Sequence, residues 1–303
     1  MFGDVEKSGS KRRTVIISDL TQVGVIRDLL ERHHFTFSKA LGQNFLINPS
    51  VCPRIAREGG AKGRCVLEIG TGIGVLTAEL ARLAKKVIAV EIDERLFPVL
   101  EETLGEFSNI RLIPGDILKI PLSDILNKEA PGEKVAVCAN LPYYITSPIL
   151  MHLLESRLPI SSITVMLQKE AAMRLCAKPG SREAGAISLA CRYYAKPQRL
   201  FEVSRGSFYP APKVDSVVIR LDVLDQPAVS VSDEQALFGL IRAAFSQRRK
   251  MLATPLSTYW NCSKEDCRNR LREVGISPSA RAEELTLEEF ACLSETGQRK
   301  QMF

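Results

Sequence analysis

The middle of the chain alternates between short apolar runs and longer amphipathic segments. Continuous apolar runs are typical of strands that are buried on both faces of a sheet. The run at residues 65–70 is of this kind, and the runs at residues 86–93, 109–116, 134–142 and 162–168 predict four more strands. Residues 74–84 and 94–104, which separate the first three runs, repeat apolar residues at helical spacing. This alternation predicts an α/β fold with a mostly parallel sheet, helices on both faces and right-handed crossovers.

Further elements are predicted on either side of this region. The runs at residues 198–204 and 214–223 predict two more strands, antiparallel additions at the sheet edge, which bring the total to seven. Upstream, residues 21–35 have apolar side chains at helical spacing and predict a short amphipathic helix. We therefore distinguish an N-terminal extension with a short helix, residues 1–36, from a sheet domain, residues 37–223.

Strand signals stop after the seventh run. Three helical segments are predicted beyond it, at residues 232–252, near 263–274 and near 286–294. Ser232 and Gln235 match the capping-box pattern that marks the start of a helix. These features predict a small all-helical C-terminal domain over residues 224–303.

The composition is that of an ordinary globular protein. The 303 residues are 45% hydrophobic and 25% charged, which is enough for a substantial core. The eight cysteines form no C-x-x-C pair and have no histidine near any pair, so we predict reduced thiols and no metal site. No run is apolar for long enough to span a membrane, and no secretory signal is visible. We therefore expect a cytoplasmic protein.

Three glycines follow the first apolar run. Gly70, Gly72 and Gly74 lie between a predicted strand and a predicted helix, where a tight turn and a ligand close to the backbone both favour residues without a Cβ. Ligands bind at such carboxyl ends of parallel strands. The spacing departs from the G-x-G-x-x-G fingerprint of nicotinamide cofactors. It therefore favours S-adenosylmethionine (SAM), with a nicotinamide cofactor as the alternative that the loop alone leaves open.

Acidic residues end the next two predicted strands. Glu91 ends the second, where a carboxylate can accept hydrogen bonds from both ribose hydroxyls of either cofactor. Asp116 ends the third, where it can accept from an adenine amine while Ile117 packs on the ring. Taken alone, Asp116 is more simply explained by a loop that caps a helix. Three successive strand ends with residues suited to a ligand favour SAM.

The fourth strand ends in the tetrapeptide Asn140-Leu141-Pro142-Tyr143. Asparagine and proline are ordinary turn residues, so a plain turn is one interpretation. The other is a site for an adenine amine, a weak nucleophile that must be held in place. The side-chain carbonyl of Asn140 and the backbone carbonyl of Leu141 can accept its N–H groups, and Tyr143 can stack on the base. Phe208, which precedes two prolines, is a candidate to cover the other face. Such a site works mainly by positioning.

These motifs resemble those of the bacterial KsgA-type small-subunit rRNA adenine dimethyltransferases, relatives of the eukaryotic small-subunit dimethylases and the erythromycin-resistance methylases. The resemblance extends from about Phe37 to the C-terminus. It implies a Rossmann-like SAM-dependent methyltransferase domain. It also implies that SAM is bound by Asn44, Leu46, Gly70, Glu91, Asp116 and Asn140. The same resemblance places Asn140, Tyr143 and Phe208 at the target base, beside the backbone carbonyl of Leu141.

The resemblance further implies an activity. A monomer would transfer two methyl groups to N6 of each of two adjacent adenosines near the 3′ end of small-subunit rRNA, with the immature small ribosomal subunit as its partner. Two features depart from the family pattern. Residues 1–35 exceed the usual short N-terminal lead and have no assigned role, and Tyr144 occupies a position where asparagine is common.

A group of basic residues lies in the predicted helical domain. Arg248, Arg249 and Lys250 follow Arg242 on what is predicted to be one helix, and the net charge is +6. An ordinary solvated face explains this pattern as well as an RNA-binding surface does. The resemblance favours contact with rRNA phosphates, which position a protein without reading sequence.

Three alternative functions stay open at this point. A large-subunit rRNA adenine methylase of the erythromycin-resistance type would use the same chemistry. A nonenzymatic RNA-binding assembly or transcription factor on the same fold is expected to have an eroded cofactor loop, whereas this loop is intact. A nicotinamide-dependent dehydrogenase is disfavoured by Ile73 and by the lack of a candidate proton donor near the cleft.

Overall fold

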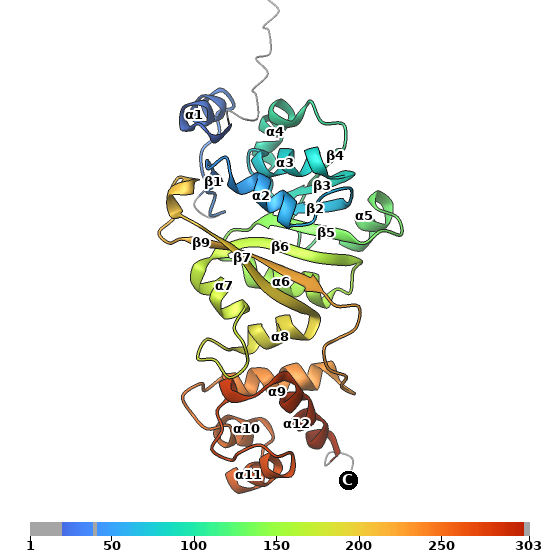
Figure 1. The fold of residues 1–303 in the computed structure, drawn as a ribbon, viewed down its shortest axis with the longest axis vertical. Coiled ribbons are helices and arrows are strands. Elements are labelled where there is room, and N and C mark those ends of the chain that lie inside the picture. Colours follow the sequence, from blue (N-terminus) through green and yellow to red (C-terminus); the bar gives the residue numbers. More distant parts are fainter. Residues whose placement is uncertain (1–19, 39–40, 300–303) are drawn as a thin grey trace, which may run out of the picture.

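A seven-stranded sheet forms the centre of the molecule (Figure 1). The structure is a computed structural model that describes residues 20–38 and 41–299. The strand order is β4 (Ile110–Pro114), β3 (Lys86–Glu91), β2 (Cys65–Ile69), β5 (Val135–Asn140), β6 (Ile160–Gln168), β9 (Ser216–Val223) and β7 (Ala195–Val203). The first five strands in this order pair in parallel, and β9 is antiparallel to both of its neighbours. The predicted fold class and all seven predicted strands are confirmed.

Helices cover both faces of this sheet. One apolar cluster contains buried side chains of α1 (Val23–Arg32), α2 (Val51–Glu58), α3 (Val75–Leu83) and α4 (Phe97–Leu104). The opposite cluster contains those of α5 (Leu122–Glu129), α6 (Thr146–Glu155), α7 (Lys169–Leu175) and α8 (Ala186–Tyr194). The central strands β2, β3, β5 and β6 contribute to both clusters, which explains why their sequences are mostly apolar.

A second, two-stranded sheet was not predicted. It pairs β1 (Phe45–Leu46) with β8 (Phe208–Tyr209) in antiparallel orientation. Strands of two residues are too short to show the alternation by which strands are recognised in a sequence. This ribbon joins the segment before α2 to the loop before β9.

The C-terminal region is helical, as predicted, but differs in detail. It contains α9 (Glu234–Phe245), α10 (Ala253–Tyr259), α11 (Lys264–Glu273) and α12 (Leu287–Arg299), and α10 was not predicted. The predicted capping box is wrong: Asp233 caps α9 by accepting from the Ala236 amide at 3.0 Å, and the Ser232 hydroxyl instead contacts Glu295.

The predicted helix over residues 232–252 is too long. Because α9 ends at Phe245, residues 246–250 form a turn, and Arg248, Arg249 and Lys250 do not continue the helix that carries Arg242. We refer to Arg248, Arg249 and Lys250 as the basic turn.

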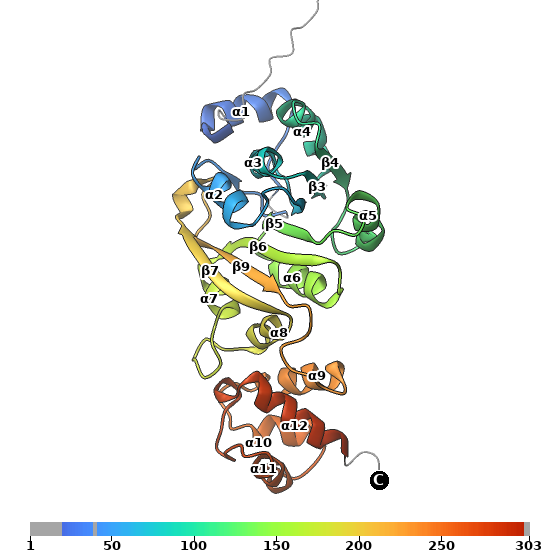
Figure 2. The same cartoon turned by 45° about the vertical axis from the view of Figure 1, so that its right-hand side comes forward.

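The C-terminal helices pack beneath α8, at the end of the molecule opposite α1 (Figures 1 and 2). Their buried residues belong to the same apolar cluster as the face of the sheet that α5 to α8 cover, which we call the lower face. Phe238 of α9 stacks on Tyr194 of α8, with 5.7 Å between the ring centroids. Nη2 of Arg248 donates to the carbonyl oxygens of Arg182 and Ala184 at 2.8 and 2.9 Å. The basic turn therefore fastens the C-terminal helices to the loop before α8. The division of the chain at residues 36 and 223 stays a prediction.

Glu68 is a carboxyl group in the middle of β2 with no exposed surface. Neither of its oxygens makes a hydrogen bond to the described part of the chain. Burial raises the pKa of Glu68 to about 8; the nearby Thr77 hydroxyl opposes this shift, and the negative charge of Glu91 adds to it. A charged carboxylate without partners would be strongly destabilising here, so the protonated form is favoured at neutral pH.

The described residues contain no disulfide, no membrane-spanning helix and no cluster of metal-ligating side chains. All eight cysteines are free thiols. Among the described residues no helix is both long and apolar enough to cross a bilayer. Within the same ranges, no three His, Cys, Asp or Glu side chains are grouped to hold a metal ion.

Replacing Glu68 by glutamine should change how stability depends on pH. Between about pH 4.5 and 8 the unfolded chain loses the Glu68 proton while the folded chain keeps it, so this group lowers the stability by up to about 1.4 kcal/mol per pH unit. Glu68→Gln cannot lose this proton and should gain stability relative to the wild type between pH 5.5 and 8, measured by urea denaturation. The exposed Glu273→Gln is the control. An equal difference from wild type at both pH values would contradict the assignment.

Arg248→Ala should destabilise the protein more than Arg249→Ala. The first variant leaves the carbonyls of Arg182 and Ala184 without their donor, whereas Arg249 is a neighbouring exposed arginine of equal charge. Because Arg248 is itself exposed, we expect a loss of about 1 kcal/mol in the free energy of unfolding. Urea denaturation of both variants measures this loss. Equal losses would show that the two hydrogen bonds do not fasten the C-terminal helices to the loop before α8.

Candidate active site

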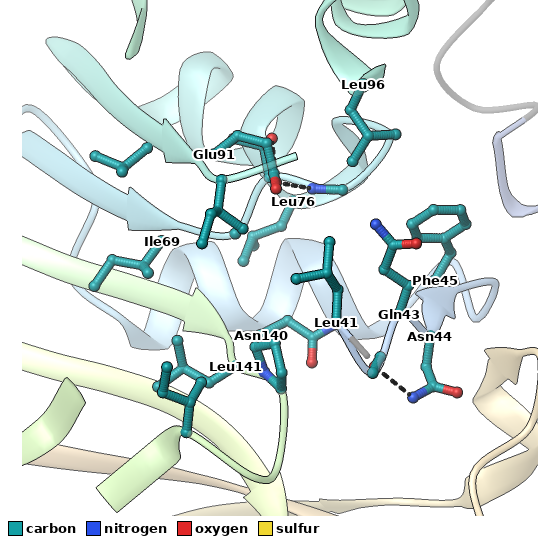
Figure 3. A pocket seen from close by; sticks show the side chains of 18 of the residues that line it. Leu41, Gln43, Asn44, Phe45, Ile69, Leu76, Glu91, Leu96, Asn140 and Leu141 are labelled. Atoms are coloured by element: carbon teal, nitrogen blue, oxygen red, sulfur yellow. Dashed lines mark hydrogen bonds between the residues drawn. The ribbon is translucent and has the colours of Figure 1, made fainter. Parts of the chain in front are cut away.

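A cavity of about 140 Å³ opens where β2, β3 and β5 end at the same edge of the sheet. Parallel strands bring their carboxyl ends together there, so residues far apart in the sequence become neighbours. Its lining includes every residue that the sequence predicted for the cofactor or the target base: Asn44, Leu46, Gly70, Glu91, Asp116, Asn140, Leu141, Tyr143 and Phe208. Figure 3 shows Glu91 on one side of this space and Asn140 with Leu141 on the other.

The glycine loop lies at the centre of this edge. Gly70 and Gly72 have φ angles of +76° and +57°, which residues with a Cβ rarely adopt. A Cβ on Gly72 would also come within 3.3 Å of the Phe45 ring. A Cβ on Gly70 would lie 4.0 Å from the carbonyl oxygen of Asn140. The loop can therefore approach both the N-terminal segment and the end of β5.

Glu91 is the most strongly bonded polar group in the cavity wall. Its Oε2 accepts from the Thr71 hydroxyl at 3.0 Å and from the Gly72 amide at 3.1 Å, and its Oε1 accepts from the Asp93 amide at 3.0 Å. Burial raises the pKa of Glu91, and these three donors oppose that shift because they favour the charged form. The result is a carboxylate that is preorganised at the end of β3.

The segment Leu41–Leu46 closes one side of the cavity (Figure 3). Nε2 of Gln43 donates to Oδ2 of Asp93 at 2.8 Å, which ties this segment to the end of β3. Asp93 also pairs with Arg95, whose hydrogen bonds hold the pKa of Asp93 below its usual range. The sequence analysis missed Gln43 and Asp93. Only the position of Asp93, two residues after Glu91 at a strand end, could have marked it.

Asp116 both caps a turn and lines the cavity, so it fits both interpretations that the sequence left open. Its Oδ1 accepts from the Leu118 amide at 3.0 Å and its Oδ2 lies 3.5 Å from Nζ of Lys119, so the side chain caps a turn. It also lines the cavity, next to the buried side chain of Ile117. The turn therefore orients a carboxylate at the cavity wall.

The end of β5 forms a corner that other elements hold in place. The Pro142 carbonyl accepts from the Thr146 hydroxyl at 3.1 Å, which fastens the corner to α6. The Tyr143 hydroxyl and Oγ of Ser216 on β9 lie 2.8 Å apart. Burial raises the pKa of Tyr143, so its hydroxyl stays protonated at neutral pH. Anchoring the hydroxyl fixes the tyrosine ring at the cavity.

Phe208 and the basic turn occupy very different places. Phe208 is only 3% exposed and packs with β1, yet it belongs to the lining of the cavity. Arg248, Arg249 and Lys250 are exposed and do not belong to that lining. The structure thus gathers the predicted cofactor and base residues but leaves the predicted RNA contacts in the C-terminal region.

Comparison with known proteins agrees with this geometry. The family model for ribosomal RNA adenine dimethylase matches residues 34–298. Proteins called ribosomal RNA small subunit methyltransferase A from Oceanobacillus iheyensis and Bacillus cereus strain B4264 are 45% and 46% identical to this chain. The alignments cover 89% and 92% of the chain and 93% and 97% of these relatives.

Solved structures give the same result. A dimethyladenosine transferase from Plasmodium falciparum is similar with a TM-score of 0.71 and 27% identity, over 85% of this chain and 98% of that one. The 23S rRNA methyltransferase ErmE is similar with a TM-score of 0.65 and 27% identity, over 83% and 98%. The family match spans most of the sequence and the fold agrees over the same region. The chain therefore belongs to the ribosomal RNA adenine dimethylase family.

Proposed function

We propose that this protein dimethylates N6 of two adjacent adenosines near the 3′ end of small-subunit rRNA, using SAM. The observation that carries the proposal is the shared cavity: the preorganised Glu91 carboxylate and the Asn140–Tyr143 corner line the same space. A cofactor site and a base site must adjoin for direct group transfer. The two relatives named above, each called a small subunit methyltransferase, support the choice of substrate.

The residues of the cavity fit SAM. Glu91 offers two carboxylate oxygens to the vicinal hydroxyls of a ribose, and Asp116 offers one to an adenine amine beside the apolar surface of Ile117. Gly70 leaves the backbone accessible, and Asn44 and Leu46 also line the cavity. When bound, SAM supplies an electrophilic methyl group on a sulfonium.

On the base side, the chain positions the adenine amine and leaves it free to release a proton after methylation. The Asn140 side-chain oxygen accepts one N–H of the adenine amine, and the Leu141 carbonyl, next to the rigid Pro142, accepts the other. Tyr143, fixed through Ser216, stacks on one face of the base, and Phe208 borders the other. The base must leave its stack to enter, which requires least energy in single-stranded RNA. A methylated amine is a cation that gives up its proton readily, so positioning does most of the catalysis.

Binding of the ribosomal particle involves surfaces outside the cavity. We assign the basic turn and Arg242 to phosphate contacts, with Arg248 also fastening the junction. We expect a cytoplasmic protein that acts as a monomer on immature small subunits. The second candidate is large-subunit rRNA, which the likeness to ErmE favours. The higher identity to the small-subunit relatives gives the first substrate precedence.

Asn140→Ala should lower methyl transfer steeply while weakening SAM binding much less, because the other residues assigned to the cofactor stay in place. Wild type, Asn140→Ala and the exposed control Asn127→Ala would be incubated with labelled SAM and under-methylated small subunits, and separately with large-subunit RNA. We expect label on two adjacent small-subunit adenosines for wild type and control, and a rate lower by about 10²–10³-fold for Asn140→Ala. Label on large-subunit RNA alone would support the second candidate. Turnover of Asn140→Ala near that of the wild type would refute its role as amine acceptor.

Glu91→Gln should weaken SAM binding and remove its dependence on pH. The glutamine keeps the shape but loses the charge, and we expect roughly 10- to 100-fold lower affinity by calorimetry. Because burial raises the pKa of Glu91, wild-type affinity should fall as the solution is acidified toward that pKa, whereas Glu91→Gln should show no such fall. The exposed Glu94→Gln is the control. Unchanged affinity in Glu91→Gln would remove this residue from the site.

A further inference from the structure

Helix α1 contacts the β1–β8 ribbon beside the candidate active site, although it lies outside the family match, which begins at residue 34. Nε of Arg27 donates to the Tyr209 hydroxyl at 2.9 Å, and the guanidinium carbon lies 5.3 Å from the centroid of the Tyr209 ring. One arginine therefore contacts both the face and the hydroxyl of the same tyrosine. Residues 1–35 had no assigned role in the sequence analysis.

Tyr209 is in turn joined to the cavity through the β1–β8 ribbon. Leu46 pairs with Phe208, and Phe45 pairs with Tyr209. The Ile47 amide donates to the carbonyl of Ser207 at 2.9 Å. Successive side chains of a strand point to opposite faces. Phe208 accordingly borders the cavity, while Tyr209 points to α1.

The far end of α1 is fixed to the body of the protein. Nη1 of Arg32 donates to Oε2 of Glu102 on α4 at 2.9 Å, and Nε2 of His33 lies 2.6 Å from the same oxygen. Ile26 and Leu29 have no exposed surface. A helix anchored in this way can hold Tyr209 against a rigid support.

Aromatic packing fills the space between α1 and the ribbon. The Phe37 ring makes an edge contact with Tyr209 at 5.8 Å between centroids and packs on Phe45 at 5.2 Å. Phe45 in turn borders Gly72 of the glycine loop. The contacts therefore run from Arg27 through the ribbon to Phe208 at the proposed base site and to the glycine loop at the proposed cofactor site.

We propose that Arg27 is a positioning residue that holds the β1–β8 ribbon, and through it Phe208, in the geometry needed for methyl transfer. This inference rests on the proposed function for the role of Phe208. Arg27 does not line the cavity, so its effect passes through Tyr209. The competing role for an exposed arginine is direct contact with an RNA phosphate, and the two roles predict different kinetics.

The test compares Arg27→Gln, Arg27→Lys, Tyr209→Phe and the double variant Arg27→Gln/Tyr209→Phe. Arg57→Gln, an exposed arginine on α2, is the charge-matched control. Methylation of under-methylated small subunits would be measured at several salt concentrations to separate kcat from KM. Calorimetry would follow SAM affinity. Hydrogen exchange of the peptide covering Phe45–Ile47 would report on the ribbon without requiring activity.

For a positioning role, Arg27→Gln should lower kcat by about fivefold, with KM for the particle and its salt dependence unchanged. Tyr209→Phe keeps the ring but loses the hydroxyl, and the double variant should be less active by clearly less than the product of the two single effects. Arg27→Lys should recover part of the loss. The ribbon peptide should exchange faster in Arg27→Gln than in wild type or Arg57→Gln.

Three results would overturn the proposal. The first is a higher KM with a salt slope reduced by about one in Arg27→Gln, which identifies a phosphate contact. The second is full additivity of Arg27→Gln and Tyr209→Phe. The third is wild-type hydrogen exchange of the ribbon peptide in Arg27→Gln. If the wild-type protein methylates no RNA, the proposed function fails, and the exchange measurement still decides whether Arg27 holds the ribbon.

Discussion

The hydrogen bonds to Glu91 hold together the strand ends that form the candidate active site. One carboxylate accepts from the loop after β2 and from the backbone after β3, so it sets the separation of two neighbouring strand ends. Glu68 on β2 is also buried, but it has no comparable donors within the described chain. Like charges in a poorly solvated region raise one another's pKa. The three donors to Glu91 favour its charged form, whereas burial raises the pKa of Glu68 to about 8 and favours its protonated form near neutral pH.

The walls of the cavity come from segments that are far apart in the sequence. The glycine loop and Glu91 belong to the parallel sheet, whereas the segment Leu41–Leu46 reaches the cavity from outside that sheet. Two features hold this segment: the Gln43–Asp93 hydrogen bond and the β1–β8 ribbon. A cofactor bound between the wall of β3 and this segment would therefore contact the same backbone that borders Phe208. If SAM and the base bind as proposed, their sites share a wall, and binding of one would order the backbone that contacts the other.

The sequence predicted the parts of the fold that depend on long apolar patterns. All seven strands of the main sheet and the helical C-terminal region follow from such patterns, and the central strands are the clearest because burial on both faces leaves few polar positions. It did not predict β1 and β8, whose two residues each are held by tertiary contacts with α1 and by packing around Phe37. It also extended α9 too far, since Arg and Lys are good helix formers and nothing local signals the turn after Phe245.

Most residues of the candidate site were also predicted from the sequence, because they lie at the ends of the predicted strands. Residues at the ends of consecutive parallel strands must be neighbours, so Gly70, Glu91, Asp116 and Asn140 could be grouped from their positions alone. Asn44 and Leu46 were grouped only through the family resemblance, because no rule of sheet topology brings a segment before the first strand to that edge. Gln43 and Asp93 escaped notice because their importance lies in contacting each other.

If the basic turn binds RNA phosphates, its position limits how the protein can select its RNA. The C-terminal helices share one apolar cluster with the lower face of the sheet, and Arg248 bonds directly to the loop before α8. A junction with a continuous packed core does not bend easily. If the basic turn binds phosphates, they are held in a fixed relation to the cavity. Selection of an adenosine would then depend on the distance along the folded rRNA between the bound phosphates and the base that enters the cavity, which is a property of ribosomal structure more than of local sequence.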